Sequence, residues 1–81
     1  MSLPSWVFGR DPGCDVRIAD DPYVSPRHAK VTLRPFVEDL GSTNGTRIER
    51  GGLMVPVRGP VELRPGDKLW IGRTAVPWEA P

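Results

Sequence analysis

The sequence predicts a small all-β protein, built as an antiparallel β-sandwich or a small barrel. Three observations predict this class. Apolar residues recur at every second position, turn signals follow one another at short intervals, and Gly or Pro interrupts every candidate helix. A length of 81 residues suits one domain, and we expect residues 1–81 to form it.

The alternation is clearest in three segments. Val16 and Ile18 are separated by a charged residue, residues 29–33 place Ala, Val and Leu at odd positions, and Leu69 and Ile71 flank a Trp. A period of two is that of a strand with one buried face. These segments therefore predict strands that cover a shared core.

Turn signals divide the chain into these strands, because Gly, Pro, Asn and Asp favour turn conformations. The signals are Asp11-Pro12-Gly13, Asp20-Asp21-Pro22, Asn44-Gly45, Gly51-Gly52, Gly59-Pro60 and Pro65-Gly66-Asp67. The predicted strands are residues 5–9, 15–18, 28–33, 36–39, 46–49, 53–57, 61–64, 67–72 and 74–78.

Composition excludes several classes of protein. The 11 basic and 10 acidic residues nearly cancel, which argues against a general nucleic-acid-binding protein. No apolar run is long enough to span a membrane, and residues 1–4 lack the pattern of a signal peptide. Cys14 is the single cysteine, so no intrachain disulfide forms, and we expect a reducing, cytoplasmic compartment. His28, the single histidine, has no Cys or His companion at metal spacing, so we expect neither a metal nor a cofactor.

Four short motifs carry the functional signal. They are Gly9-Arg10, Ser25-Pro26-Arg27-His28, the stretch from Asp39 to Thr46 (Asp-Leu-Gly-Ser-Thr-Asn-Gly-Thr), and the stretch from Leu63 to Gly72 (Leu-Arg-Pro-Gly-Asp-Lys-Leu-Trp-Ile-Gly). The first three supply what a phosphate needs, namely a guanidinium, hydroxyl groups and backbone N–H groups. Arg10 offers the guanidinium, and the hydroxyl groups come from Ser25, Ser42 and Thr43. All of them fall at strand ends or in loops, where a rigid sandwich can present them together.

These motifs, in this order, resemble the forkhead-associated (FHA) domain family over about residues 7–76. The resemblance implies an FHA/SMAD-like β-sandwich that binds phosphothreonine peptides through loops at one end. It implies that four residues contact the phosphopeptide: Arg10, Ser25, Thr43 and Asn44. It implies that four others shape the site: Gly9, His28, Ser42 and Gly45. By this resemblance, Arg10 and Ser25 hold the phosphate and Asn44 holds the peptide backbone.

The expected function is that of an adaptor in Ser/Thr kinase signalling, with no catalytic activity. Its partner is then a protein carrying phosphothreonine, such as a Ser/Thr kinase or its substrate. The alternative is a phospho-independent scaffold or oligomerisation module of the same fold. A hydrolase using Ser25 and His28 is disfavoured, because nucleophilic catalysis also needs an orienting group and an oxyanion site.

Three features depart from the family pattern. Pro26 stands where many members carry a donor for the phosphate, and Pro has neither a side-chain donor nor an N–H. Arg17 and Arg27 are candidates to compensate. Glu49 stands where the family commonly has Asn, and its charge would repel phosphate unless it points away or pairs with Arg47 or Arg50.

The third departure is a short N-terminal segment, since only eight residues precede Gly9. We expect one or two N-terminal strands of the family to be missing. A missing strand leaves a sheet edge unpaired, which predicts a dimer or strand exchange through that edge.

Several residues have a structural interpretation beside the functional one. Asn44-Gly45 is a strong hairpin signal in its own right. Cys14 is expected to pack in the core, Thr46 to be structural, and Asp67 to shape the Pro65-Gly66 turn. The three tryptophans are expected to serve as core or edge cover: Trp6, Trp70 and Trp78.

Overall fold

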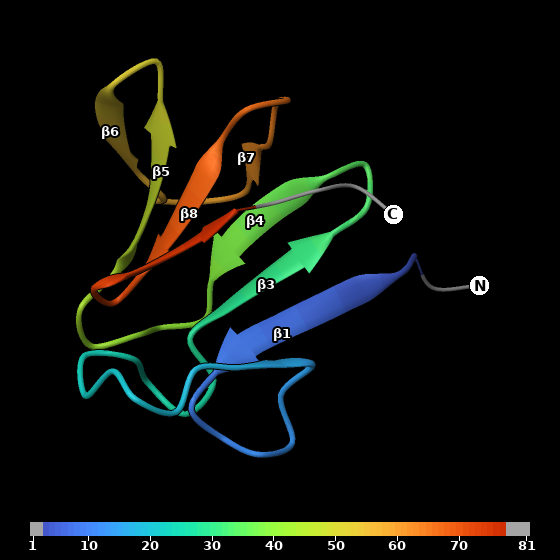
Figure 1. Cartoon of the computed structure of the whole chain (residues 1–81). Coiled ribbons are helices and arrows are strands. Elements are labelled where there is room, and N and C mark those ends of the chain that lie inside the picture. The colour runs from blue at the N-terminus through green and yellow to red at the C-terminus, as the bar shows by residue number, and fades with distance from the viewer. Residues whose placement is uncertain (1–2, 78–81) are drawn as a thin grey trace.

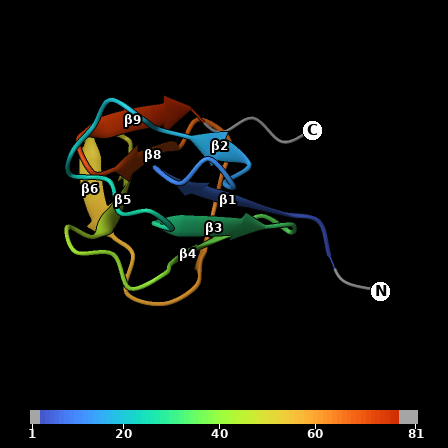
Figure 2. The same ribbon diagram turned by 90° about the horizontal axis from the view of Figure 1, so that it is seen from below.

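A computed structural model describes residues 3–77, which form nine strands in two facing sheets (Figures 1 and 2). The first sheet has the strand order β2-β1-β3-β4-β7, and the second has the order β6-β5-β8-β9. Residues 3–77 contain no helix long and apolar enough to cross a membrane. The two sheets confirm the predicted all-β sandwich.

Each predicted strand segment matches a strand of the structure to within two residues at either end. The first sheet comprises β1 (Ser5–Gly9), β2 (Val16–Arg17), β3 (Ala29–Thr32), β4 (Phe36–Asp39) and β7 (Val61–Glu62). The second comprises β5 (Thr46–Arg50), β6 (Leu53–Pro56), β8 (Lys68–Ile71) and β9 (Thr74–Pro77). β2 and β7 are shorter than predicted, and Trp78 lies outside the described residues.

The direction of β2 differs from the expected antiparallel arrangement. β1 and β2 are parallel, with Phe8 opposite Val16, whereas the other strand pairs run antiparallel. Side-chain alternation determines which face a residue takes but carries no information on strand direction, so the sequence could not predict this pair.

The edge beside β1 also differs from expectation. β1 lies between β2 and β3, so it is an interior strand of its sheet. β2 pairs with Phe8 and Gly9, and the Val7 N–H donates to Asp15 Oδ2 at 2.8 Å. A side chain thus satisfies part of the edge that was expected to be unpaired.

The core lies between the two sheets and consists of aliphatic residues with one aromatic residue. Its buried members are Phe8, Val24, Ala29, Val31, Val37, Ile48, Val57, Leu63, Leu69 and Ile71. Each large side chain buried in this way stabilises the fold by about 1.5–3 kcal/mol. Val16 and Ile18, predicted from the alternation, pack against this core while partly buried.

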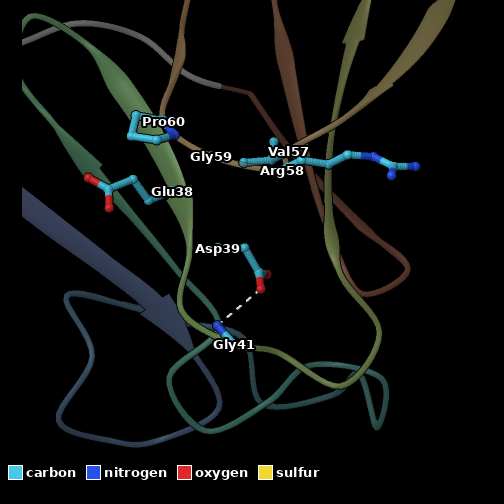
Figure 3. Close-up of a pocket in the computed structure, with 7 residues that line it drawn as sticks. All are labelled: Glu38, Asp39, Gly41, Val57, Arg58, Gly59 and Pro60. Atoms are coloured by element: carbon cyan, nitrogen blue, oxygen red, sulfur yellow. Dashed lines mark hydrogen bonds between the residues drawn. The ribbon is translucent and has the colours of Figure 1, made fainter.

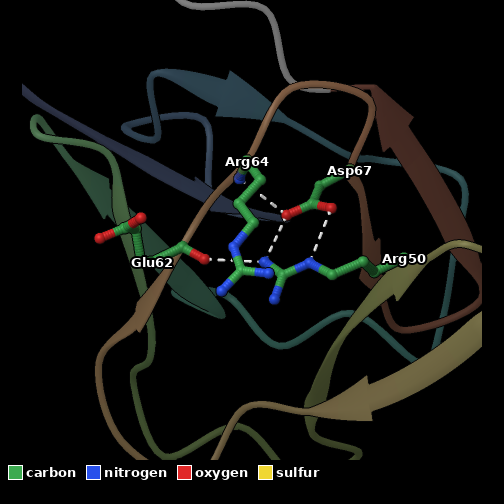
Figure 4. A network of polar contacts seen from close by, with 4 residues as sticks. All are labelled: Arg50, Glu62, Arg64 and Asp67. Atoms are coloured by element: carbon green, nitrogen blue, oxygen red, sulfur yellow. Dashed lines mark hydrogen bonds and ion pairs between the residues drawn. The ribbon is translucent and has the colours of Figure 1, made fainter.

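At the end where β5 finishes, an ion pair connects Arg50 with Asp67 in the connection between β7 and β8 (Figure 4). Arg50 donates from Nε to Asp67 Oδ1 at 3.0 Å, and from Nη2 to Asp67 Oδ2 at 2.6 Å and to the Glu62 carbonyl at 2.9 Å. Asp67 Oδ2 also accepts the Arg64 N–H at 2.8 Å, which closes the Pro65-Gly66 turn as predicted. The Arg50 hydrogen bond outweighs the effect of burial and lowers the pKa of Asp67 below its ordinary value. We refer to Arg50, Glu62, Arg64 and Asp67 as the clasp.

The opposite end of the sandwich carries the loops that contain the functional motifs. The β1–β2 and β2–β3 connections, the β4–β5 loop and the β8–β9 turn gather at the lower end of Figure 1. The fold therefore brings three of the four sequence motifs, and the end of the fourth at Gly72, to one end of the molecule.

Candidate functional site

Arg10 follows the last residue of β1, and its backbone is fixed on both sides. Its N–H donates to the Ser25 carbonyl at 3.1 Å, and its carbonyl accepts from Arg17 Nε at 3.0 Å. The side-chain Nε donates to the Val24 carbonyl. Among the described residues, neither Nη atom of Arg10 has a hydrogen-bond partner. The guanidinium is thus positioned by one nitrogen while its outer two nitrogens are available to a ligand.

Gly9 allows the second loop to approach the end of β1. A Cβ at Gly9 would lie 2.2 Å from the Pro26 carbonyl oxygen and 3.0 Å from Cys14 Sγ, so no side chain fits. That carbonyl accepts the Asp11 N–H at 3.1 Å and the Cys14 thiol at 3.1 Å. Gly9 therefore shapes the site through close backbone packing, and Cys14 is a packing residue.

His28 is fully buried and connects two loops. Its Nδ1 accepts the Ser25 N–H at 3.0 Å, and its Nε2 lies 2.8 Å from the Gly45 carbonyl. A neutral ring carrying its proton on Nε2 satisfies both contacts. Both ring nitrogens are bonded to backbone groups, so His28 holds the loops together and makes no hydrogen bond with the Ser25 hydroxyl.

Asp39, at the end of β4, organises the loop that follows it. Its Oδ2 accepts the N–H groups of Gly41 at 3.0 Å and Ser42 at 2.9 Å, while its Oδ1 accepts the hydroxyls of Ser42 and Thr46. Burial raises the pKa of Asp39, but the hydrogen bonds from Ser42 and Thr46 outweigh it and hold the pKa below its ordinary value. The Ser42 oxygen also accepts the Gly45 N–H at 3.0 Å, so the Ser42 hydroxyl is fully used within the loop.

Asp39 is a site residue to which sequence reasoning gave no role. The signal was present, because Asp three positions before a Ser commonly accepts the N–H groups of the turn that follows. Thr46 is buried and bonded to Asp39 at 2.7 Å, in agreement with the structural role predicted for it.

Thr43 and Asn44 occupy the exposed tip of this loop. The Thr43 N–H donates to Ser25 Oγ at 3.1 Å, which leaves the Ser25 hydroxyl proton available for a ligand. Asn44 Nδ2 donates to the Tyr23 carbonyl at 2.9 Å, which leaves its Oδ1 available as an acceptor. Both loops are therefore connected directly as well as through His28.

One small pocket contains all four residues predicted to contact the phosphopeptide. Its volume is about 170 Å³, and it is lined by Arg10, Pro22, Tyr23, Val24, Ser25, Pro26, Thr43 and Asn44. The residues predicted to shape the site do not line the pocket: Gly9, His28, Ser42 and Gly45. Instead, they contact the backbone of the loops that carry the pocket residues.

Asp21 is a second residue that the sequence did not identify. Its buried carboxylate accepts the Tyr23 N–H at 2.8 Å, the Arg73 N–H at 2.7 Å and the Thr74 hydroxyl at 2.8 Å. Burial raises its pKa, but the hydrogen bonds, led by that of Thr74, bring the pKa below its ordinary value. Asp21 thereby attaches the wall of the pocket to the β8–β9 turn.

The departures from the family pattern have distinct structural outcomes. Glu49 does not line the pocket, and its Oε1 accepts the Trp70 Nε1–H at 3.0 Å instead of pairing with Arg47 or Arg50. Pro26 does line the pocket and brings no donor to it. Arg17 is engaged with the Arg10 carbonyl, and Arg27 is exposed.

Two larger hollows lie elsewhere on the described surface. One of about 340 Å³ is lined by Glu38, Asp39, Gly41 and residues 57–60, with the Glu38 and Arg58 side chains extending to opposite sides (Figure 3). Another, of about 520 Å³, lies beside the β3–β4 turn. Neither contains a predicted contact residue, and within residues 3–77 no group of His, Cys, Asp and Glu could hold a metal ion. Convergent open donors, rather than volume, distinguish the small pocket.

The β-sandwich and its loop-built polar pocket define a binding module that presents its site at one end. The FHA domain family model matches residues 6–72, and the chain belongs to the FHA domain family. This agrees with the resemblance over about residues 7–76 that the four motifs indicated.

Two curated relatives match this chain over part of their longer sequences. The chain is 40% identical over 73 residues to the FHA domain-containing protein FhaB of Mycobacterium tuberculosis, covering 86% of this chain and 44% of FhaB. It is 38% identical over 74 residues to the proliferation marker protein Ki-67 of Mus musculus, covering 88% of this chain and 2% of Ki-67. The chain thus spans less than half the length of these relatives.

Solved structures agree with the fold. The FhaA FHA domain, complexed with the intracellular domain of Rv3910, superimposes with a TM-score of 0.76 at 28% identity, covering 93% of this chain and 79% of that chain. The N-terminal FHA domain of S. cerevisiae Rad53p, in complex with a phosphothreonine peptide, gives a TM-score of 0.69 at 30% identity, covering 85% and 57%.

Proposed function

We propose that this chain is a phosphothreonine-peptide-binding interaction module that serves as an adaptor in Ser/Thr kinase signalling. The observation that carries the proposal is the Arg10 guanidinium, whose outer nitrogens are open beside the Ser25 hydroxyl in one pocket. The Rad53p domain, solved with a phosphothreonine peptide, supports the same chemistry here.

In this proposal each contact residue has one role. Arg10 and Ser25 bind the phosphate oxygens, Thr43 adds a hydroxyl, and Asn44 holds the backbone of the peptide through its free amide oxygen. Each charge-assisted hydrogen bond contributes about 1.5–3 kcal/mol. Two or three of them support a weak to moderate affinity once the cost of ordering the peptide is subtracted.

The proposed partner is a protein carrying phosphothreonine, either a Ser/Thr kinase or its substrate. We also propose that residues 1–81 act as one domain without catalytic activity, and that the site of action is the cytoplasm. The arrangement of His28 supports the non-catalytic role, because its ring nitrogens face the Ser25 N–H and the Gly45 carbonyl and neither reaches the Ser25 hydroxyl as a base. The single cysteine, free and buried, suits a reducing compartment.

The test is a titration of the 81-residue chain with a phosphothreonine peptide library and its unphosphorylated copy, followed by fluorescence anisotropy. We expect binding of the phosphorylated library alone, and loss of that binding in Arg10→Ala. Equal affinity for both libraries would refute the proposal.

A phospho-independent scaffold or oligomerisation module is the second candidate. Two observations favour it: Pro26 lines the pocket without a donor, and the edge strand β6 exposes Leu53 and Met54 by 71% and 46%. It predicts self-association through a sheet edge, measured by light scattering across a concentration series. A constant monomeric mass would exclude self-association, whereas a sulfate ion bound by Arg10 and Ser25 in a crystal would favour the phosphate-binding function.

A further inference from the structure

Arg73, in the β8–β9 turn, stacks on an aromatic ring at the rim of the pocket. Its guanidinium carbon lies 4.3 Å from the centroid of the Tyr23 ring. Tyr23 lines the pocket and is 40% exposed, and its carbonyl accepts the amide of Asn44. Tyr23 therefore contacts both Arg73 and Asn44, the residue that is proposed to hold the peptide backbone.

The backbone of Arg73 is held in this position. Its N–H donates to Asp21 Oδ2 at 2.7 Å. Gly72 precedes it with φ of 61°, and a Cβ at Gly72 would lie 2.9 Å from Val24 Cγ2 and 3.0 Å from the Tyr23 carbonyl carbon. The turn is thus packed directly on the wall of the pocket, so the cation is fixed relative to the site.

The charge of Arg73 helps to lower the pKa of Asp21, but the two side chains do not form an ion pair. Arg73 forms no ion pair with another residue of the described range, in which Arg50 and Asp67 form the ion pair of the clasp. Both carboxylate oxygens of Asp21 are occupied by N–H groups and the Thr74 hydroxyl. Arg47 adds a second cation, since its Nη2 donates to the Gly72 carbonyl at 3.2 Å.

We propose that Arg73, stacked on Tyr23, selects phosphothreonine peptides that carry an acidic side chain in the segment that passes Asn44 and Tyr23. Stacking occupies the face of a guanidinium and leaves its N–H edge free for a carboxylate. The ring also restricts the arginine, which lowers the entropy lost on binding. A basic side chain in the same segment is repelled by Arg73 and Arg47. This inference rests on the proposed function and adds a preference for charge to it.

The test uses a phosphothreonine peptide in which each flanking position is changed in turn to Asp, Ala or Lys. At one position or two adjacent positions, we expect Asp to bind about two- to fivefold more tightly than Ala, the range of an exposed ion pair. Lys should bind more weakly than Ala there. Because exposed charges are screened by salt, the Asp preference should shrink when the salt is raised from about 0.05 M to about 0.5 M.

Three variants connect the preference to this residue. Arg73→Gln should lose the preference and bind the Asp and Ala peptides with equal affinity. Arg73→Glu should reverse it in favour of Lys. Arg34→Gln is the matched control, because Arg34 is an exposed arginine in the β3–β4 turn at the other end of the strands, and it should keep the parent's profile.

The possible results separate this inference from the function on which it depends. Binding of phosphorylated peptides with a flat charge profile, or an Asp preference that survives in Arg73→Gln, would overturn the inference alone. Failure of every phosphorylated peptide to bind the parent chain would overturn both. Melting curves of each variant confirm that the comparison is made between folded proteins.

Discussion

Two arginines at opposite ends of the sandwich show how one residue type serves two purposes. Arg50, in the clasp, directs Nε and Nη2 to Asp67 and to the Glu62 carbonyl, and its partner Asp67 has a side chain only 3% exposed (Figure 4). Arg10 directs Nε to the Val24 carbonyl, and within the part of the chain that the structure describes its two outer nitrogens have no partner. An arginine can bind a ligand when Nε is held by the protein and the two Nη atoms are free. An arginine that bonds to the protein through both Nε and Nη serves the structure instead.

The carboxylates of the two ends extend this contrast. The Asp67 carboxylate accepts from the charged guanidinium of Arg50 as well as from the Arg64 N–H, whereas the Asp39 carboxylate accepts from the uncharged N–H and hydroxyl groups of Gly41, Ser42 and Thr46. At the loop end, Asp39 and His28 use their hydrogen-bonding groups within the protein. They fix the backbone of the loops that carry Ser25 and Asn44, whose side chains keep groups available for a ligand. Such support holds a site in its binding geometry before the ligand arrives.

The largest expected effect is on binding at the loop end. Arg10→Ala should weaken phosphothreonine-peptide binding by about 30-fold or more, because a charge-assisted pair of hydrogen bonds is lost. The free energy of unfolding should change by less than about 0.5–1 kcal/mol, since Arg10 is exposed. Calorimetric titration and urea unfolding measure the two quantities. Arg10→Lys keeps the charge but lacks the forked guanidinium, so its affinity for the phosphopeptide should lie between those of the parent and Arg10→Ala. A large loss of stability in Arg10→Ala would contradict the distinction between the two ends.

The second effect is on stability at the clasp. Asp67→Ala should lower the free energy of unfolding by about 1–3 kcal/mol, because the Arg64 N–H and the Arg50 guanidinium lose their acceptor. The folded fraction should bind the phosphopeptide with the parent's affinity. Unchanged urea unfolding of Asp67→Ala, or weaker peptide binding at full folding, would show that the two ends are not independent.

The third effect is a dependence of stability on acid. At Asp21 and Asp39 burial raises the pKa, but hydrogen bonds outweigh it and hold the pKa below the ordinary value of 3.8. At Asp67 the hydrogen bond from Arg50 is the main cause of a pKa that is also below 3.8. A carboxyl with a lowered folded pKa stabilises the fold above its unfolded pKa, and this stabilisation is lost as the pH falls from that value through the folded pKa. Urea unfolding between about pH 6 and about pH 3 should show this loss. Asp67→Asn should have a lower free energy of unfolding near neutral pH and should lose less of it as the pH falls. An acid profile identical to that of the parent would exclude Asp67 as a contributor.

The sequence predicted the parts of the molecule that depend on local pattern. Period-two alternation located the strands, and turn residues located their ends, because both properties are set by neighbours in the chain. The four motifs also located the pocket residues, which the structure brings together.

The rest depends on contacts between distant segments. Asp21 bonds to the Arg73 N–H, 52 positions away, and Arg50 pairs with Asp67, 17 positions away, so neither role has a local signature. Trp70 as the partner of Glu49 and the stacking of Arg73 on Tyr23 likewise require the folded arrangement of the sheets. Arg50 and Arg10 differ in how many of their guanidinium nitrogens have partners within the protein. That difference can be seen only in the folded structure.

The smallest expected effect concerns Pro26, a residue that lines the pocket and offers no donor. Its carbonyl accepts the Asp11 N–H and the Cys14 thiol, contacts that any residue at this position retains. Pro26→Lys adds a cation beside the phosphate and should tighten binding of the phosphorylated peptide about two- to fivefold, the range for an exposed ion pair. Pro26→Ala restores the N–H without the charge and controls for the loss of proline rigidity. If Pro26→Lys tightens phosphorylated and unphosphorylated peptides equally, the added charge acts non-specifically and position 26 does not contact the phosphate.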